Sequence, residues 1–300
     1  MSASDSDFFH LHAHSEFSYL DALSPVEALV DRAVRNKQPA LGLTDHGVMA
    51  GVSRLYKLTK EAGILAFPGE EFYVVSSVED KKAPRRHLTM AALNFKGYQG
   101  LIALSSASHQ RENYHYKPRI DYRMLAEFGD EFGDDVVVAT GCFFGVLARA
   151  LLDESRGAAK QILLTLDSWF PHLYVELQRH GIETPEQSDV DLSRELWALA
   201  SELGLPVIIT QDAHYERIGQ KADHDFFKNI AYMSAEDQSF PGDGYHLART
   251  HWVKSHYDTG DLVDWSMWQG SLNSCRELLD LNKLEMPALD SYTFRVPSSG

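Results

Sequence analysis

Three histidines lie within five residues near the N-terminus, in the run His10-Leu11-His12-Ala13-His14. In an extended segment, residues two apart point to the same side, so His12 and His14 can direct their imidazole rings to one point. Neutral imidazole is a common protein ligand for zinc and similar metals. Asp21 follows and adds a carboxylate. The run indicates a metal site, and the alternative is a histidine-rich surface patch or the remnant of a terminal tag.

Further metal-binding residue types come directly after the apolar segments that we expect to be strands. These residues are His46, Glu71, Cys142, Asp212 and His214. In parallel α/β folds, functional residues gather at the carboxyl ends of the strands, so we expect these side chains to meet. His87 stands at the start of an apolar run, where a lone histidine is more often exposed or part of the core.

The mixture of histidine, cysteine and carboxylate suits zinc, manganese or iron better than calcium, which prefers oxygen ligands. The candidates are too many for one ion, so we expect two or three divalent ions, some sharing a carboxylate. Closely spaced ions favour phosphoester hydrolysis, in which a metal-bound hydroxide attacks phosphorus. This chemistry needs no serine or cysteine nucleophile, and we interpret Cys142 as a ligand thiolate.

The composition limits the class of protein. The chain has 300 residues, 44% of them hydrophobic, and a net charge of −15 from 43 acidic and 28 basic residues. The negative charge argues against broad binding of nucleic acid to a basic surface, although it does not exclude a nucleic-acid enzyme. Two cysteines argue against a disulfide framework. No apolar run is long enough to span a membrane, and the polar N-terminus lacks a secretory signal, which predicts a cytoplasmic protein.

Short apolar runs alternate with helical patterns as far as Tyr215, which predicts a mostly parallel sheet, open or closed into a barrel. The expected strands are 8–12, 40–44, 65–67 continuing through 72–75, 87–93, 135–139, 173–177 and 206–210. The expected helices are 25–35, 52–62, 97–111, 145–154, 158–169, 190–203, 221–232 and part of 257–281. We expect one domain over residues 1–285, with 215–285 as its helical, loop-rich closing part, and a tail or linker over 286–300.

Taken together, the motifs resemble those of a known family. They are the histidine run with Asp21, Leu43-Thr44-Asp45-His46-Gly47, Pro68-Gly69-Glu70-Glu71, His87-Leu88-Thr89, Thr140-Gly141-Cys142 and Thr210-Gln211-Asp212-Ala213-His214-Tyr215. The set resembles the PHP (polymerase and histidinol phosphatase) family, and most closely the N-terminal PHP domain of bacterial DNA polymerase III alpha subunits. The resemblance covers about residues 8 to 285.

The resemblance implies a distorted seven-stranded (β/α)7 barrel, TIM-like in type, with a trinuclear metal centre. The residues that match the ligand positions are His12, His14, Asp21, His46, Glu71, His87, Cys142, Asp212 and His214. In the family pattern Glu71 bridges two ions, whereas His10 matches no ligand position and supports the site or begins a strand. Many polymerase PHP domains have lost ligands and become structural, but this chain keeps all nine.

The function that this resemblance implies is a metal-dependent phosphodiester hydrolase, a proofreading 3′→5′ exonuclease acting on a DNA single strand or 3′ end. Asp212, His214 and Glu71 are the residues expected to carry catalysis, and components of a replicative polymerase are candidate partners. One alternative is a phosphomonoesterase acting on a small metabolite, as in the histidinol-phosphate branch. The other is a metal-stabilised structural module of a polymerase. Whether the chain is a stand-alone protein or a domain of a longer one is left open.

Positively charged and aromatic residues are candidates for contacts with the substrate. Lys117, Arg119 and Arg179 are expected to bind phosphate, with Arg111 as a weaker candidate. The basic loop 81–86 precedes His87 and either guides a nucleic-acid strand or is a solvated loop. Three aromatic residues either stack on a terminal base or belong to the core, namely Tyr114, Tyr116 and Phe143.

Overall fold

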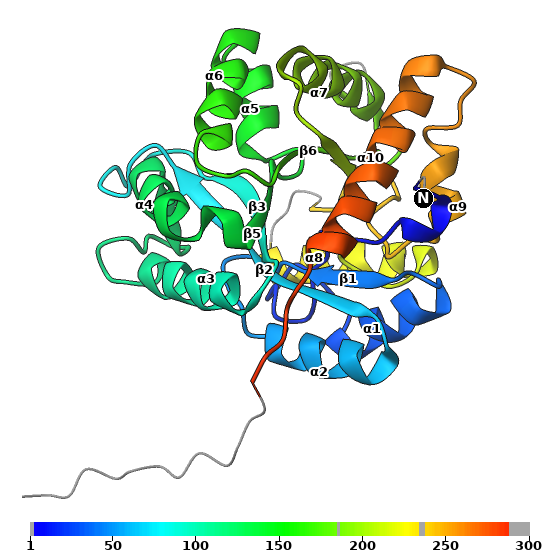
Figure 1. The fold of residues 1–300 in the computed structure, drawn as a ribbon, viewed down its shortest axis with the longest axis horizontal. Helices are drawn as coiled ribbons and strands as arrows, with labels where there is room; N and C mark the ends of the chain where they lie inside the picture. The colour runs from blue at the N-terminus through cyan, green and yellow to red at the C-terminus, as the bar shows by residue number, and fades with distance from the viewer. Residues whose placement is uncertain (1–2, 185–186, 234–237, 288–300) are drawn as a thin grey trace, which may run out of the picture.

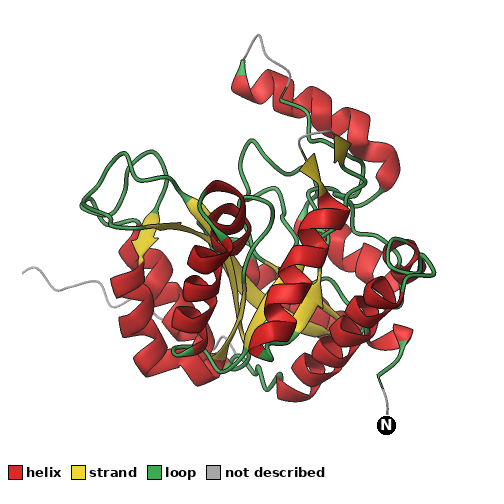
Figure 2. Cartoon of the chain, turned by 90° about the horizontal axis from the view of Figure 1, so that it is seen from above, coloured by secondary structure: helices red, strands yellow, loops and turns green. Residues whose placement is uncertain are grey.

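In the computed structural model, the described residues are 3–184, 187–233 and 238–287. Seven strands form one curled sheet, and the helices pack around it (Figures 1 and 2). The strands of this sheet are β1 Ala40–Leu43, β2 Leu65–Val75, β3 Arg86–Ala92, β4 Arg119–Asp121, β5 Val136–Ala139, β6 Leu173–Leu177 and β9 Val207–Ile209. Their order is β1-β2-β3-β5-β6-β9, with β4 paired to β2. A separate two-stranded sheet consists of β7 Glu183–Thr184 and β8 Gln187–Ser188.

The N-terminal segment joins the two edges of this sheet. His10 makes a parallel bridge to Leu41 in β1, and Ala13 makes a parallel bridge to Ala213, just after β9. The approach to β1 is so close that a Cβ atom added to Gly42 would lie 1.9 Å from the Leu11 carbonyl oxygen. The predicted seven-stranded, barrel-like α/β fold is therefore confirmed. The expected strand at 8–12 is wrong, because this segment makes only isolated bridges.

Strand β3 runs antiparallel to both of its neighbours, whereas the other strand pairs of the large sheet are parallel. Its first residues therefore lie at the edge where the neighbouring strands end. Tyr73 pairs with His87, and Glu71 pairs with Thr89. This direction brings His87, at the start of its strand, to the same edge as residues that follow the parallel strands.

The helices have clear local causes, and most agree with the expected ranges. They are α1 Val26–Arg35, α2 Val52–Ala62, α3 Phe95–Ser108, α4 Tyr122–Phe132, α5 Val146–Asp153, α6 Arg156–Asp167, α7 Asp189–Leu203, α8 Lys221–Tyr232, α9 Thr250–Ser255 and α10 Leu262–Leu281. The sequence analysis missed α4 and α9. It also missed the N-cap of α4, where the Asp121 side chain accepts a hydrogen bond of 3.0 Å from Met124 N.

The core lies between the sheet and the helices. Every residue of β5 is buried, and the buried Trp268 of α10 packs against Phe8, with ring centroids 5.4 Å apart. Burial of a large apolar side chain contributes about 1.5–3 kcal/mol to stability, so these layers hold the strand ends in place. No helix among the described residues is long and apolar enough to cross a membrane. Of the predicted tail 286–300, residues 288–300 lie outside the described part.

Candidate metal centre

The nine side chains predicted to be metal ligands lie in one cluster at the edge where the parallel strands end. In each of the nine, a nitrogen, oxygen or sulfur atom lies within 3.6 Å of such an atom in another member. They come from the N-terminal segment, from β2 and β3, and from the segments that follow β1, β5 and β9. Strand ends thus bring together residues that are far apart in the chain, such as His14 and His214, which are 200 positions apart.

Glu71 lies at the centre of the cluster and is fully buried. Its Oε1 atom is 3.4 Å from His12 Nε2 and 3.1 Å from His87 Nδ1. Its Oε2 atom is 2.6 Å from His46 Nδ1 and 3.6 Å from His14 Nε2. A carboxylate with different histidines at its two oxygens is suited to be shared between two ions.

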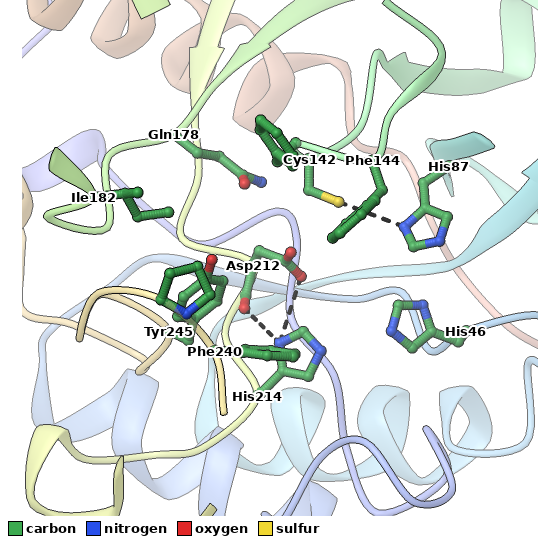
Figure 3. Close-up of a pocket in the computed structure, with 12 residues that line it drawn as sticks. His46, His87, Cys142, Phe144, Gln178, Ile182, Asp212, His214, Phe240 and Tyr245 are labelled. Carbon is green, nitrogen blue, oxygen red and sulfur yellow. Dashed lines mark hydrogen bonds and ion pairs between the residues drawn. The ribbon is translucent and has the colours of Figure 1, made fainter. Parts of the chain in front are cut away.

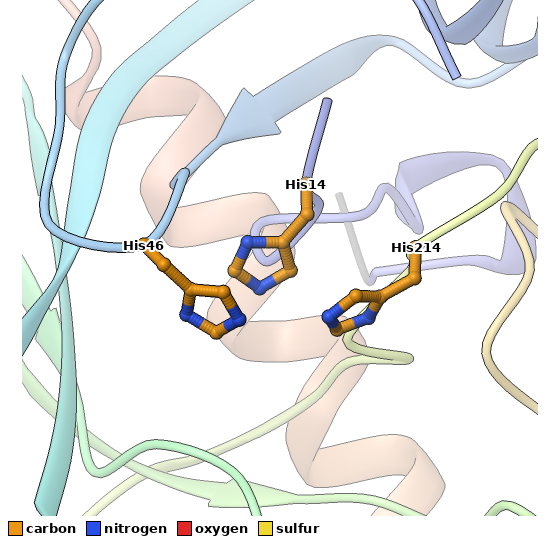
Figure 4. A group of neighbouring side chains, drawn as sticks. All are labelled: His14, His46 and His214. Carbon is orange, nitrogen blue, oxygen red and sulfur yellow. The ribbon is translucent and has the colours of Figure 1, made fainter. Parts of the chain in front are cut away.

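The cluster contains three overlapping groups whose ligand atoms all lie within 4.8 Å of one another. Figure 4 shows one of them, His14, His46 and His214, whose rings face a common point. The other two groups are His12, His14 and Glu71, and His46, Glu71 and His87. Because each pair of groups shares one residue, the arrangement is consistent with several neighbouring ions.

Three histidines are held from behind through Nδ1, and their Nε2 atoms face the centre, where those of His12 and His14 lie 3.0 Å apart. His12 Nδ1 donates to Glu176 Oε1 at 2.7 Å, and His214 Nδ1 donates to the Asp212 carbonyl oxygen at 2.7 Å. His14 Nδ1 lies 3.0 Å from Ser18 Oγ, whose own hydroxyl donates to Asp45. A proton on Nδ1 leaves the lone pair on Nε2, which is the atom that can bind a metal.

Several buried polar atoms of the cluster make no hydrogen bond within the described part of the chain. They are both carboxylate oxygens of Glu71, Asp212 Oδ1, His46 Nδ1 and His214 Nε2. A buried polar atom without a partner costs about 1–3 kcal/mol, and native proteins nearly always satisfy such atoms. The cluster therefore fits a bound cation, and its mixture of imidazole, carboxylate and thiol fits zinc, manganese or iron.

The electrostatics of the cluster also favour cations. Burial opposes the charged form of His12, but the carboxylates of Glu176, Asp212 and Glu71 raise the pKa of His12 well above its ordinary value. Burial raises the pKa of the Cys142 thiol, and the negative charge of Glu71 and Asp212 raises it further. By contrast, burial lowers the pKa of His14 and of His214, which keeps these two rings in the neutral form that binds a metal.

Glu176 is a site residue that the sequence analysis did not assign. It is buried in β6, and besides His12 it accepts hydrogen bonds from Gly141 N at 3.0 Å and Gln178 Nε2 at 2.8 Å. Carboxylates that hold a ligating histidine from behind fix its tautomer and its orientation. The available signal was a single charged residue inside the apolar run Leu173–Leu177.

Helix α8 was also not expected to contribute to the site. Lys228 forms an ion pair with Asp21 Oδ1, while Asp21 Oδ2 lies 3.1 Å from His46 Nε2. His224 Nε2 donates to the Asp21 carbonyl oxygen at 2.8 Å. These contacts attach α8 to the turn that carries Asp21.

His10, by contrast, points away from the cluster and donates to the Ala248 carbonyl oxygen at 2.9 Å, in agreement with a supporting role.

Asp212 has a backbone conformation that is unusual for a residue other than glycine. Its φ is +47°, in the left-handed region. Such a conformation costs about 1–3 kcal/mol and is concentrated at functional sites, where the surrounding structure holds it. Here the bridge between Ala13 and Ala213 holds the turn, so that Asp212 and His214 both reach the cluster.

The comparison with known families agrees with this geometry. A model of the PHP domain matches residues 10–180, more than half of the chain. The chain belongs to the PHP domain family. The matched range includes seven of the nine clustered residues of this PHP domain, and Asp212 and His214 follow it.

This PHP domain is similar to DNA polymerase III alpha subunits. It is 29% identical over 308 residues to that of Aquifex aeolicus, covering 97% of this chain and 25% of the relative. It is 34% identical over 220 residues to that of Treponema pallidum, covering 69% of this chain and 18% of the relative. The chain thus spans a quarter or less of the length of these relatives.

A solved structure of a candidate metal-dependent phosphoesterase from Bifidobacterium adolescentis aligns with a TM-score of 0.49 and 14% identity. The alignment covers 82% of this PHP domain and 94% of that chain. The assignment to the family rests on the match to the PHP domain, and this structural similarity adds nothing to it.

The three residues expected to bind phosphate lie in different environments. Lys117 is exposed, with its Nζ 5.4 Å from the Tyr73 ring, and it lies near Asp21 of the centre. Arg119 is buried and donates to the carbonyl oxygens of Asn113, Asp80 and Val78. That environment favours a structural role for Arg119.

Arg179 is also buried, and protein groups surround its guanidinium. It donates to Asp264 Oδ1 at 2.7 Å, to Ser193 Oγ at 2.9 Å and to the His256 carbonyl oxygen at 2.6 Å. Its guanidinium carbon lies 4.4 Å from the centroid of the Tyr257 ring. These contacts likewise favour a structural role.

The remaining candidates for substrate contacts lie on the surface. Tyr114 and Tyr116 are exposed, and Phe143 is half-buried beside the metal centre. In the basic loop 81–86, both lysines are exposed, and Arg86 forms an ion pair of 2.7 Å with Asp153. The loop leads directly into His87, so its exposed positive charge lies next to the cluster.

Proposed function

We propose that this PHP domain is a metal-dependent phosphodiester hydrolase that acts as a 3′→5′ exonuclease on DNA. The observation that carries the proposal is the convergence of nine ligand-type side chains on one buried centre, with Glu71 between its histidines. Two or three divalent ions of zinc, manganese or iron would be held there. The similarity to DNA polymerase III alpha subunits supports DNA as the substrate and replicative polymerase components as partners.

Bound ions would supply the charge that makes a water molecule more acidic and stabilises the phosphate during attack. The protein itself supplies the orientation. Glu176 and Ser18 fix the rings of His12 and His14 from behind. Asp212 contacts both rings through Oδ1, which leaves Oδ2 to accept a proton from the attacking water.

Substrate binding in this proposal uses groups on the cavity side of the centre. His214 and Asp212 line the cavity and would face the scissile phosphate. Lys117, exposed and near Asp21, would contact a neighbouring phosphate of the strand.

The predicted cytoplasmic location stays a prediction.

The test uses a DNA strand labelled at its 3′ end and protein stripped of metal, then supplied with Mn²⁺, Zn²⁺ or Fe²⁺. We expect stepwise release of labelled mononucleotides, lost in His12→Ala and in Asp212→Asn, because both changes remove atoms that face the centre. Metal content per chain is measured on the same samples. Control variants are Arg123→Ala and His251→Ala, two exposed residues outside the cluster.

The two alternatives give different results in the same assay. Rapid turnover of a small phosphomonoester together with inert DNA would overturn the exonuclease in favour of a metabolite phosphatase. Unfolding on chelation of the metal, without hydrolysis of any phosphoester, would favour a structural module. Release of nucleotides by the His12→Ala variant at the wild-type rate would show that hydrolysis occurs elsewhere or comes from a contaminant.

A further inference from the structure

A cavity of about 140 Å³ lies directly beside the metal centre (Figure 3). One part of its wall consists of candidate ligands, namely His46, His87, Cys142, Asp212 and His214. The rest comes from three segments that follow β5, β6 and α8 in the chain. The cavity is therefore the space that a group attached to a metal-bound phosphate would enter.

The wall away from the ligands is apolar and rich in aromatic rings. Figure 3 shows Phe144 on one side of the cavity and Phe240 and Tyr245 on the other. The centroids of the Phe240 and Tyr245 rings are 4.7 Å apart, and Phe240 lies edge-on to His214 at 4.9 Å. Ile182 completes this wall. Flat, apolar ligand groups are the ones that such a surface binds.

Phe144 is unusual because it is a large aromatic residue that is 58% exposed beside a buried polar centre. It is held there by its backbone, since the Phe144 carbonyl oxygen accepts a hydrogen bond of 2.9 Å from His87 N. The turn before it depends on Gly141, whose φ is +84° and where an added Cβ would lie 2.7 Å from the His87 carbonyl oxygen. The fold therefore fixes the backbone of Phe144 beside the ligand His87, and the two ring centroids lie 6.1 Å apart.

Gln178 is a polar lining residue outside the ligand set, and its amide is already engaged. Its Nε2 donates to Glu176 Oε1 at 2.8 Å and to Thr210 Oγ1 at 3.0 Å. Its Oε1 accepts from His180 Nε2 at 3.1 Å. Both N–H donors of this amide are therefore used, so Gln178 cannot donate a hydrogen bond to the edge of a base. Binding through stacking alone tolerates every base, since each has a π-face.

We propose that this cavity binds the base of the 3′-terminal nucleotide against Phe144 and Phe240 and does not select among the four bases. The proposal rests on the proposed exonuclease function and adds the part of the substrate that is recognised. It explains why an aromatic wall stands beside the ligands of a phosphate-binding centre. A substrate without a flat ring would leave this wall exposed to water.

The test compares two DNA strands that differ only in the last residue, one ending in a normal nucleotide and one in an abasic residue. With Mn²⁺, we expect wild-type protein to release the normal nucleotide about 5- to 150-fold faster, the range given by the loss of stacking on one base. The rates for the four normal bases should agree with one another within about threefold. In Phe144→Ala the ratio of the release rates from normal and abasic ends should fall toward one. Phe144→Tyr should restore the wild-type ratio.

A binding measurement keeps the test independent of hydrolysis. With Mn²⁺ present, wild-type protein should bind dAMP more tightly than deoxyribose 5-phosphate. Phe144→Ala and Phe240→Ala should each bind the two ligands with about equal affinity. The matched control is Phe226→Ala, a similarly exposed phenylalanine on α8 that does not line the cavity, which should keep the preference.

Two outcomes separate this proposal from the function on which it rests. Equal release of normal and abasic ends by wild-type protein would overturn the base-binding cavity and leave the exonuclease standing. Absence of hydrolysis would overturn the exonuclease. In that case, tighter binding of dAMP than of deoxyribose 5-phosphate would still support the base-binding cavity. Equal binding of the two compounds would overturn the base-binding cavity.

Discussion

Two regions of this molecule bury charged side chains almost completely, and they treat them in opposite ways. In the first, Arg179 and Asp264 form an ion pair in which each group has several further hydrogen bonds. In the second, the metal centre, Glu71 and Asp212 face histidine rings, and several of their oxygens accept no hydrogen bond within the described residues. The charges of the first region are satisfied by protein groups, whereas in the second the ligand-type atoms converge on one another without hydrogen-bond donors.

The difference separates structural charges from functional ones. A buried charge is tolerated when it is paired and its hydrogen bonds are satisfied, which makes the Arg179–Asp264 pair part of the fold. A group of buried acceptors without donors is costly, and proteins keep such groups where a ligand completes them. The two regions differ in this combination: protein groups occupy the donors of Arg179, whereas Glu71 accepts no hydrogen bond within the described residues and lies among histidine rings.

The largest expected effect is on stability at the ion pair. Asp264→Asn leaves the buried Arg179 guanidinium without its anion, which should lower the free energy of unfolding by about 3–5 kcal/mol. Urea denaturation of the metal-free protein measures the change. The loss should be the same with and without divalent metal, because the pair does not touch the centre.

Asp261 provides a matched control for this variant. It is also an aspartate paired with Arg194, at 3.1 Å, but 44% of its side chain is exposed. Asp261→Asn should cost no more than about 1 kcal/mol, since exposed ion pairs contribute little. Equal losses in Asp261→Asn and Asp264→Asn would contradict the structural role assigned to burial of the pair.

The second prediction concerns metal and the centre. A divalent ion at 1,000 times its dissociation constant should raise the free energy of unfolding by about 4 kcal/mol in the wild type, because it binds only the folded state. Glu71→Gln should lose most of this gain, because it removes the carboxylate on which the histidines of the cluster converge. The same gain from metal in Glu71→Gln as in the wild type would show that Glu71 does not hold an ion.

The sequence was sufficient to predict most of the centre, because its residues follow apolar runs and strand ends meet in α/β folds. Asp212 and His214 illustrate this, since the run 206–210 is readily recognised as a strand. His87 could be placed only by the family resemblance, because its strand is antiparallel and nothing in the local pattern gives strand direction. The segment at 8–12 has the apolar pattern of a strand, but it makes only isolated bridges where it joins the sheet edges.

Residues whose role depends on distant partners could not be predicted. Arg119 and Arg179 are charged in sequence and were expected to bind phosphate, but backbone carbonyls and Asp264 occupy their donors. Lys228 lies in a helix with no family motif, and its contact with Asp21 spans 207 positions. Such pairings are set by how the helices pack on the sheet, for which the local sequence carries no signal.

A smaller effect is expected when a ligand is left in place but its support is changed. Glu176→Gln keeps the size of the side chain and removes the charge that orients His12, so metal affinity should fall about 10- to 100-fold. Titration of metal-free protein with Zn²⁺ measures it. Glu70→Gln is the control, because Glu70 is also a buried glutamate but faces away from the centre. It lies beside Ser105 of α3, and burial raises the pKa of Glu70 to about 8. A similar loss of affinity in both variants would remove Glu176 from the site.

The smallest effect is a dependence on pH at the ion pair. Burial opposes ionisation of Asp264, but hydrogen bonds from Arg179, Arg194 and Thr259 hold its pKa well below the usual 3.8. A carboxyl group with a depressed pKa in the folded state adds stability that is fully present above the unfolded pKa and is lost as the pH falls. The difference in unfolding free energy between wild type and Asp264→Asn should therefore be constant from pH 7 to about 5 and shrink below pH 4. Urea denaturation of both proteins at pH 6 and pH 3.5 measures it, and a difference that does not shrink at pH 3.5 would mean that the pair acts through packing and not through its charge.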